Sequence, residues 1–190
     1  MHVIKCQAVA TMSAENTAPY GLVRDAAIVI QEGRISWVGP AERCPSVFSK
    51  ATFTDFGDRL VTPSFVDCHT HIVSGGNRAQ EFEMRLNGAS YEEVARAGGG
   101  IVSTVSATRE ASFDALVSDA LPRIDAMIAE GTSLVEVKSG YGLDVETELK
   151  MLRAAKRLAE LRSIRIVTTF LGAHAVPPEF AGEPDRYIDE

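Results

Sequence analysis

Beyond residue 60 the sequence repeats one pattern, and this pattern limits the possible folds more than any other feature. An apolar run of strand length is followed by a loop rich in glycine or polar residues and, in most cases, by a helical pattern. The four runs cover residues 60–68, 100–105, 133–137 and 164–171. Strands that are almost continuously apolar are buried on both faces, as parallel strands covered by helices are. The sequence therefore predicts an α/β fold with a parallel sheet.

Three helices are predicted between these runs. Ser90 and Glu93 have the spacing of a capping box, which predicts a short helix over 90–96. A longer helix over 112–130 carries one apolar stripe, and Pro122 should kink or split it. The third helix covers 144–161, and its inward residues are expected to be Val145, Leu149, Leu152 and Leu158.

The N-terminal part of the chain, 1–60, has a different pattern, that of short strands joined by turns. The predicted strands are 2–10, 26–30 and 35–38. The last two flank a turn in which Gly33 allows the positive φ of a hairpin. We therefore predict a β region over 1–60 and an α/β region over 61–190.

Composition narrows the class of partner. The net charge of −7 and the pI near 5.2 disfavour nucleic acid or an anionic membrane, since both would repel an acidic surface. Cys6, Cys44 and Cys68 are odd in number, widely spaced and without a CxxC pair, which disfavours a disulfide framework or a cysteine zinc cluster. No leader pattern opens the chain, and no apolar run has the length of a membrane span. These features predict a cytoplasmic protein that acts on a small molecule.

Two histidines separated by one residue end the first apolar run. Successive side chains of a strand point to opposite faces, so His69 and His71 are expected to share one face. Two imidazoles so placed can bind one metal ion. The alternative is a pair of loop histidines that are hydrogen-bonded to backbone. Two ligands are too few to hold a divalent ion tightly, so a metal site would need further ligands.

The segments around these histidines resemble a known enzyme family. The run VTPSFVDCHTH resembles the first-strand signature of the amidohydrolase superfamily, which consists of metal-dependent hydrolases. Three further segments resemble the imidazolonepropionase family within it; they read GGNRAQEFEMRLNGASYEEVARAGGGIVSTVSATR, VEVKSGYGL and TFLGAHAVPPE. The resemblance implies a (β/α)8 barrel of TIM type with a small β-sandwich. Residues 1–60 would then be the N-terminal part of the sandwich, and 61–190 the first half of the barrel.

The resemblance also implies an activity and a set of site residues. His69 and His71 would hold one divalent ion, zinc or iron, and Arg78, Tyr141 and His174 would bind substrate. The implied reaction is hydrolysis of 4-imidazolone-5-propanoate to N-formimidoyl-L-glutamate in histidine degradation, and the full-length protein could be a homodimer. The side chains suit these roles, since a guanidinium can hold a carboxylate in a bidentate pair and an imidazole can donate to or accept from the substrate ring.

Each substrate residue also has a structural alternative, and these alternatives stay open. Arg78 could be a solvated loop arginine, Tyr141 a packing residue and His174 a hydrogen-bonded structural histidine. Lys138 is expected to be ion-paired or to lie just outside the metal site, because it ends the third run and the mononuclear family pattern lacks a lysine ligand.

The length of the chain bears on the activity. A closed (β/α)8 barrel needs about 250 residues, and in the family the remaining metal ligands come from later strands. We therefore expect a fragment that holds half of the metal site and lacks an identifiable catalytic acid or base. The alternatives are another cyclic-amide hydrolase or deaminase of the superfamily, or a non-catalytic half-barrel that needs a partner.

Overall fold

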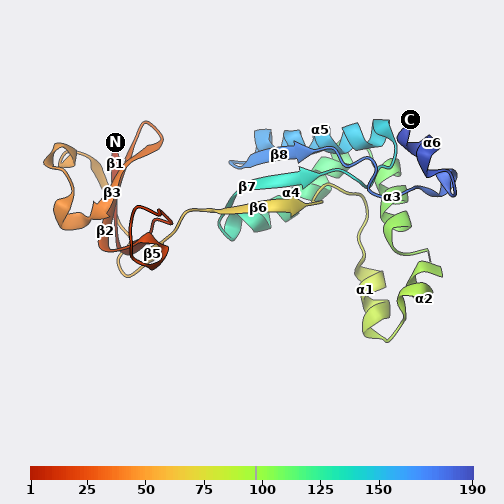
Figure 1. The fold of residues 1–190 in the computed structure, drawn as a ribbon, viewed down its shortest axis with the longest axis horizontal. Helices are drawn as coiled ribbons and strands as arrows, with labels where there is room; N and C mark the ends of the chain where they lie inside the picture. The colour runs from red at the N-terminus through yellow and green to blue at the C-terminus, as the bar shows by residue number, and fades with distance from the viewer. Residues whose placement is uncertain (97) are drawn as a thin grey trace. The chain divides into compact units, whose positions relative to one another are not determined.

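The computed structural model describes residues 1–96 and 98–190. The chain forms two compact units, Met1–Ser64 and Phe65–Glu190 (Figure 1). No helix in the described residues is long and apolar enough to cross a membrane.

The first unit is built on one five-stranded sheet with β1 at its centre. Along the sheet the order is β3–β2–β1–β4, and β5 also pairs with β1. Neighbours β1–β2 and β2–β3 are antiparallel, whereas β4 and β5 run parallel to β1. The strands are β1 (His2–Ala10), β2 (Leu22–Gln31), β3 (Arg34–Pro40), β4 (Thr52–Asp55) and β5 (Leu60–Val61). Short 3-10 turns lie at Pro19–Gly21, Ala41–Arg43 and Ser46–Phe48.

The predicted hairpin is confirmed. Strands β2 and β3 pair up to Gln31 and Arg34, and both intervening residues, Glu32 and Gly33, have positive φ of 52° and 74°. Two positive φ angles characterise the type I′ turn, whose twist matches that of the flanking strands. The described residues of this unit form a single sheet, so their assignment to a sandwich stays a prediction.

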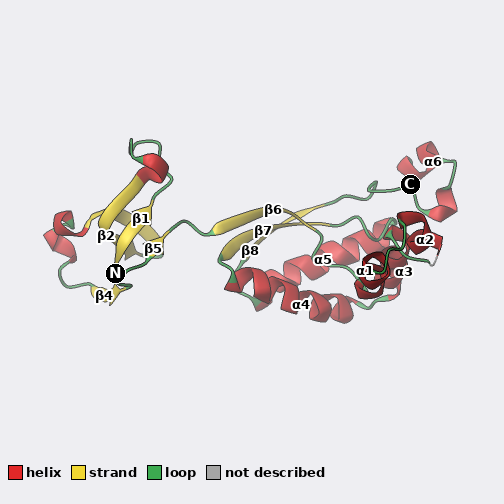
Figure 2. Ribbon diagram, turned by 90° about the horizontal axis from the view of Figure 1, so that it is seen from below, coloured by secondary structure: helices red, strands yellow, loops and turns green. Residues whose placement is uncertain are grey.

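The second unit is an α/β layer structure. Strands β6 (Phe65–Thr70), β7 (Thr132–Lys138) and β8 (Arg165–Thr169) form a parallel sheet in that order. Helices α4 (Phe113–Ala129) and α5 (Val145–Leu161) lie side by side against one face of this sheet (Figures 1 and 2). Ser112 and Asp144 cap these helices through side-chain bonds to the amides of Ala115 and Thr147. The predicted α/β class and both long helices are confirmed.

The core between helices and sheet is assembled from small and medium apolar side chains. Strand β7 contributes Val135 and Val137 to this core. Glu136 and Lys138 alternate with them and lie on the opposite face of the strand. The buried helix residues are Leu116, Val117, Ala120 and Ile124 of α4 and Met151, Ala154, Ala155 and Leu158 of α5. Helix α4 runs through Pro122 as one element, so the predicted split does not occur.

The predicted inward face of α5 was partly wrong. Val145 and Leu149 are 50% and 38% exposed, whereas Thr147 and Glu148 are buried. The alanines of this helix let it pack closely against the core, and this contact sets the rotation of the helix. Val145 and Leu149 then lie at the margin of this contact.

The second of the four predicted strands was also wrong. Residues Ile101–Glu110 form helix α3, so the described part of the unit has three parallel strands instead of the expected four. The β-branched residues of this segment favour a strand locally. In the helix the Thr108 hydroxyl donates to the Thr104 carbonyl and accepts the Gly75 amide, both at buried positions. The bond from Gly75 is a tertiary contact, and such contacts override local preference.

The first predicted run is divided between the units. Strand β5 pairs with β1 in the first unit, and β6 pairs with β7 in the second. Residues 62–64 lie between the two strands and are exposed, with Pro63 unable to donate a backbone hydrogen bond. One apolar run in the sequence thus serves two sheets.

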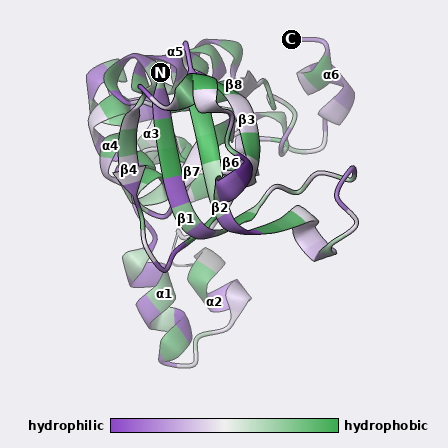
Figure 3. Cartoon of the chain, turned by 90° about the vertical axis from the view of Figure 1, so that its left-hand side faces the viewer, coloured by the Kyte–Doolittle hydropathy of each residue, from purple (hydrophilic) through white to green (hydrophobic). Residues whose placement is uncertain are grey.

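The remaining helices are short and lie at the margins of the second unit. Helices α1 (Ala79–Leu86) and α2 (Tyr91–Arg96) form a small pair that extends away from the sheet (Figures 1 and 3). Figure 3 shows hydrophobic and hydrophilic residues mixed along α1. The predicted capping box of α2 is present, since Ser90 and Glu93 bond to each other's amides. A 3-10 turn at Pro178–Phe180 and helix α6 (Pro184–Ile188) follow β8.

Candidate metal and substrate site

The two histidines of the HxH pair lie at the carboxyl end of β6. Asp67 accepts the His69 amide at 3.2 Å, and the Thr70 hydroxyl donates to the Glu136 carbonyl at 2.7 Å, which fixes this strand end to β7. The His69 and His71 ring centroids are 5.5 Å apart. The rings are therefore close enough to approach a common ion.

The surroundings of His71 favour a neutral imidazole. Burial lowers the pKa of His71 below its usual value of 6.5, and the positive charges that His174, His69 and Lys138 can carry lower it further. A backbone hydrogen bond with Ser139 opposes this shift. Nδ1 of His71 is buried and has no hydrogen-bond partner among the described residues. A neutral, partly unsatisfied imidazole suits a metal ligand.

Among the described residues, no larger group of possible metal ligands surrounds this pair. No group of three or more His, Cys, Asp or Glu side chains able to hold a metal ion occurs in residues 1–96 and 98–190. The donors thus fit two positions of a histidine-ligated ion, which needs further ligands to be held tightly.

Tyr141 and His174 come from distant segments and meet the histidine pair. The His174 ring stacks on His71 with centroids 5.0 Å apart and planes 5° from parallel. The Tyr141 ring lies 5.1 Å from His71 and 5.6 Å from His174. Because β6, β7 and β8 are parallel neighbours, the loops after them meet at one edge of the sheet. The structure therefore brings four of the five predicted site residues together.

Arg78 makes its contact with a different element. It precedes α1, and its Nε donates to the Thr104 hydroxyl of α3 at 3.0 Å. No hydrogen bond, ion pair or ring contact among the described residues joins Arg78 to the four rings. The side chain is exposed, so its guanidinium remains accessible to an anion.

Lys138 forms the ion pair expected from the sequence. Its Nζ lies 2.6 Å from Oε1 of Glu136, and Thr169 donates to the same carboxylate. The Lys138 and Thr169 bonds hold the pKa of Glu136 below its usual range. The ammonium therefore serves to neutralise a neighbouring carboxylate.

Two charged residues beside the site, Glu148 and Arg109, were not predicted from the sequence. The Glu148 carboxylate is fully buried and accepts hydrogen bonds from the loop that carries Tyr141. Arg109 donates to carbonyls of the same loop. A signal for Glu148 was present, since it lies in register with Met151, Ala155 and Leu158 on the apolar side of a helical repeat.

Comparisons with known proteins identify the relatives of the chain. No protein-family model matches it. A Ruegeria sp. protein named imidazolonepropionase is 64% identical over 189 residues, which is 100% of this chain and 46% of that protein. Proteins of the same name from Roseobacter denitrificans and Paracoccus denitrificans are 64% and 57% identical, covering 90% and 93% of this chain and 43% and 44% of theirs.

Solved structures agree on the fold. The atrazine chlorohydrolase TrzN of Arthrobacter aurescens, solved with zinc and atraton, matches 100% of this chain and 41% of its own with a TM-score of 0.56 at 17% identity. The ochratoxinase of A. niger matches 88% of this chain and 30% of its own with a TM-score of 0.54 at 14% identity. At such identities the likeness concerns the fold alone.

The relation of the chain to imidazolonepropionases rests on sequence identity. Over nearly its whole length the chain is a homologue of imidazolonepropionases, and it spans a little under half of the length of the curated relatives it matches.

Proposed function

We propose that the full-length protein hydrolyses 4-imidazolone-5-propanoate to N-formimidoyl-L-glutamate. The observation that carries this proposal is the identity of 57–64% to proteins named imidazolonepropionase along at least 90% of the chain. In the reaction the ring carbonyl carbon gains the oxygen of water, its C–N bond breaks and the ring nitrogen takes a proton. The meeting of His71, Tyr141 and His174 at one sheet edge supports this assignment.

The side chains of this region can orient such a substrate. The exposed Arg78 guanidinium would bind the propionate carboxylate in a charge-assisted pair. Tyr141 would hold the imidazolone ring through its hydroxyl and aromatic face. His174 would hold it through Nε2, the ring nitrogen that is not bonded to Gly140. Holding reactants in a near-attack geometry can supply several kcal/mol of the barrier.

His69 and His71 would hold one divalent ion, zinc or iron, together with ligands from the rest of the protein. A bound ion lowers the pKa of water to about 7 and polarises a carbonyl. The lowered pKa of His71 supports this role, because only a neutral imidazole binds a metal. No protein nucleophile is then needed.

The architecture proposed for the full-length protein follows the same reasoning. Phe65–Glu190 would supply the first strands of a (β/α)8 barrel, and the first unit would be the N-terminal part of a β-sandwich. Three parallel strands with helices on one face support the barrel, and active sites of barrels lie at the carboxyl ends of the strands. We also propose a cytoplasmic protein that can form a homodimer.

Purified full-length protein with a panel of substrates tests the proposal. We expect hydrolysis of 4-imidazolone-5-propanoate, loss of activity with a chelator, and recovery on adding zinc or iron. Arg78→Met should raise KM more than it lowers kcat, since the pair with the propionate forms in the ground state as well. Turnover of dihydroorotate, a hydantoin or guanine in place of imidazolone propanoate would overturn the assignment.

A further inference from the structure

We propose that Glu148 is a positioning residue for substrate binding, which fixes the loop of residues 139–144 and through it orients His174 and Tyr141. This inference rests on the proposed function, in which both rings contact substrate. It assigns a role to a buried carboxylate that no part of the proposed mechanism uses.

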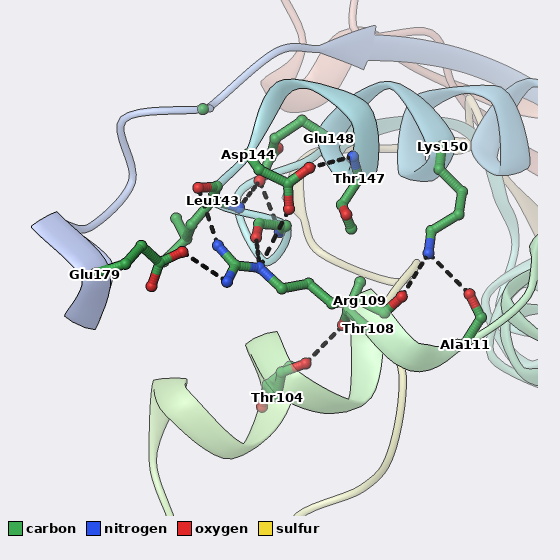
Figure 4. Close-up of polar contacts among 12 residues, drawn as sticks. Thr104, Thr108, Arg109, Ala111, Leu143, Asp144, Thr147, Glu148, Lys150 and Glu179 are labelled. Carbon is green, nitrogen blue, oxygen red and sulfur yellow. Dashed lines mark hydrogen bonds and ion pairs between the residues drawn. The ribbon is translucent and has the colours of Figure 1, made fainter. Parts of the chain in front are cut away.

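The Glu148 carboxylate accepts three backbone amides of this loop. Its Oε2 lies 2.6 Å from the Gly140 nitrogen, and its Oε1 lies 2.7 Å and 2.8 Å from the nitrogens of Gly142 and Leu143 (Figure 4). The side chain is 0% exposed. Three donors therefore converge on one anion away from water, where charge-assisted hydrogen bonds are stronger than neutral ones.

The loop needs such an acceptor because of its backbone conformation. Gly140 and Leu143 have positive φ of 114° and 54°, so the chain cannot continue the hydrogen bonding of β7 through them. A buried amide left without a partner costs about 1–3 kcal/mol. The carboxylate thus compensates for a conformation that would otherwise leave three buried donors unsatisfied.

Arg109 holds the same loop from its carbonyl side. Its Nε and Nη2 donate to the carbonyls of Gly142 and Leu143 at 2.7 Å and 3.1 Å (Figure 4). The guanidinium also pairs with Asp144 at 3.2 Å and with Glu179 at 2.7 Å. The loop is therefore fixed between a carboxylate from α5 and a guanidinium from α3.

The loop in turn fixes His174. Nδ1 of His174 lies 2.9 Å from the Gly140 carbonyl, which can only accept, so Nδ1 carries the proton and Nε2 of the neutral ring is left as an acceptor. The contact is tight, because a Cβ on Gly140 would lie 2.7 Å from the same nitrogen. Displacing the loop would therefore change the position of the His174 ring and free its tautomer.

Nuclear magnetic resonance of the 190-residue chain can test the series of contacts from Glu148 through the loop to His174. The sequence has four histidines, so the ring nitrogens of His174 can be assigned by comparison with a His174→Gln variant. The unsubstituted chain should show His174 with Nδ1 protonated. Glu148→Gln replaces one acceptor oxygen with a donor, and we expect a mixture of His174 tautomers together with exchange of the Gly140, Gly142 and Leu143 amides faster by about tenfold or more.

Two comparisons separate positioning from a general loss of structure. Glu146→Gln alters an exposed carboxylate two residues away on the same helix and should change none of these signals. The amides of Val135 and Val137 in β7 should keep their protection in Glu148→Gln. An unchanged His174 tautomer in Glu148→Gln, or equal loss of protection in the loop and in β7, would overturn the proposal.

If Glu148→Gln does not fold, two other measurements test the proposal. The unsubstituted chain must protect the three loop amides, and Glu148→Asp, which keeps the charge but shortens the reach, must alter the His174 ring signals. Absence of either result would overturn the proposal. These measurements involve no turnover. A negative result here would therefore leave the proposed hydrolysis by the full-length protein untouched, and absence of hydrolysis would leave these measurements unchanged.

Discussion

At the scale of single residues, the HxH pair leads to a prediction about metal binding. We expect His69→Asn or His71→Asn to weaken zinc binding by the 190-residue chain by roughly tenfold or more, since even outer partners of metal ligands contribute 10–100-fold. Isothermal titration calorimetry with zinc measures this change. His2→Asn is the matched control, because His2 bonds to Thr52 and Thr54 in the first unit. Equal zinc affinity in all three variants would contradict the assignment of the pair.

From local rules alone, only the proximity of the two histidines in the candidate site could be predicted. Strand alternation predicts that His69 and His71 lie together, and their rings are 5.5 Å apart. Tyr141 and His174 were candidates only through the family resemblance, and the parallel order of β6, β7 and β8 in the structure brings them to the same sheet edge. The roles of Glu148 and Arg109 depend on the exact path of a loop with positive φ angles, which no periodicity encodes.

At the scale of the element, the corrected face of α5 can be tested with two leucines. Leu158 is 0% exposed and Leu149 is 38% exposed. We expect Leu158→Ala to lower the free energy of unfolding of the second unit by about 2–5 kcal/mol, because it leaves a cavity in the core. Leu149→Ala should cost about 1 kcal/mol or less.

Urea unfolding followed by circular dichroism measures this difference. Trp37, the single tryptophan, lies in the first unit, so its fluorescence transition should be unchanged in both variants. Equal destabilisation by the two substitutions would support the rotation that the sequence alone predicts for this helix.

The capping box of α2 leads to a prediction about pH. Hydrogen bonds from Ser90 hold the pKa of Glu93 below its usual 4.5. A carboxylate with a depressed pKa stabilises the folded form above its unfolded pKa and loses this contribution as pH falls through its folded pKa. Protection of the Ser90 amide, which donates to Glu93, should therefore fall in acid below the usual carboxyl pKa. Glu93→Gln should remove this pH dependence, and an unchanged profile in that variant would contradict it.

Elements were predictable where caps and apolar periodicity agreed. Helices α4 and α5 begin after Ser112 and Asp144, as their patterns require. Helix α3 was mistaken for a strand because its β-branched residues are common in strands, while the contact of Thr108 with Gly75 comes from a distant part of the chain. The division of one apolar run between β5 and β6 likewise depends on which sheet each half joins.

At the scale of the whole molecule, we expect the 190-residue chain to bind metal weakly and to show no hydrolysis of 4-imidazolone-5-propanoate. The described residues supply two candidate metal donors and no cluster of three, and the chain spans 43–46% of the length of its relatives. Initial rates of the purified chain with added zinc or iron, compared with buffer and with the full-length protein, measure this. Robust turnover by the short chain alone would refute it.

The parallel sheet of the second unit also has a consequence for the order of folding. Phe65 of β6 pairs with Thr132, whereas Leu134 of β7 pairs with Arg165, so the first pairing closes a much longer loop than the second. Each doubling of a loop adds about 0.6 kcal/mol to the entropic cost of closing it. We therefore expect β7, α5 and β8 to associate before β6 joins them.

Pulse-labelled hydrogen exchange during refolding measures this order, and the amides of β7 paired with β8 should become protected before those paired with β6. Simultaneous protection of both pairings would contradict it. The strand that carries His69 and leads into His71 would then be the last to arrive. A metal ion present during refolding would accordingly act late, by trapping a nearly finished sheet instead of nucleating it.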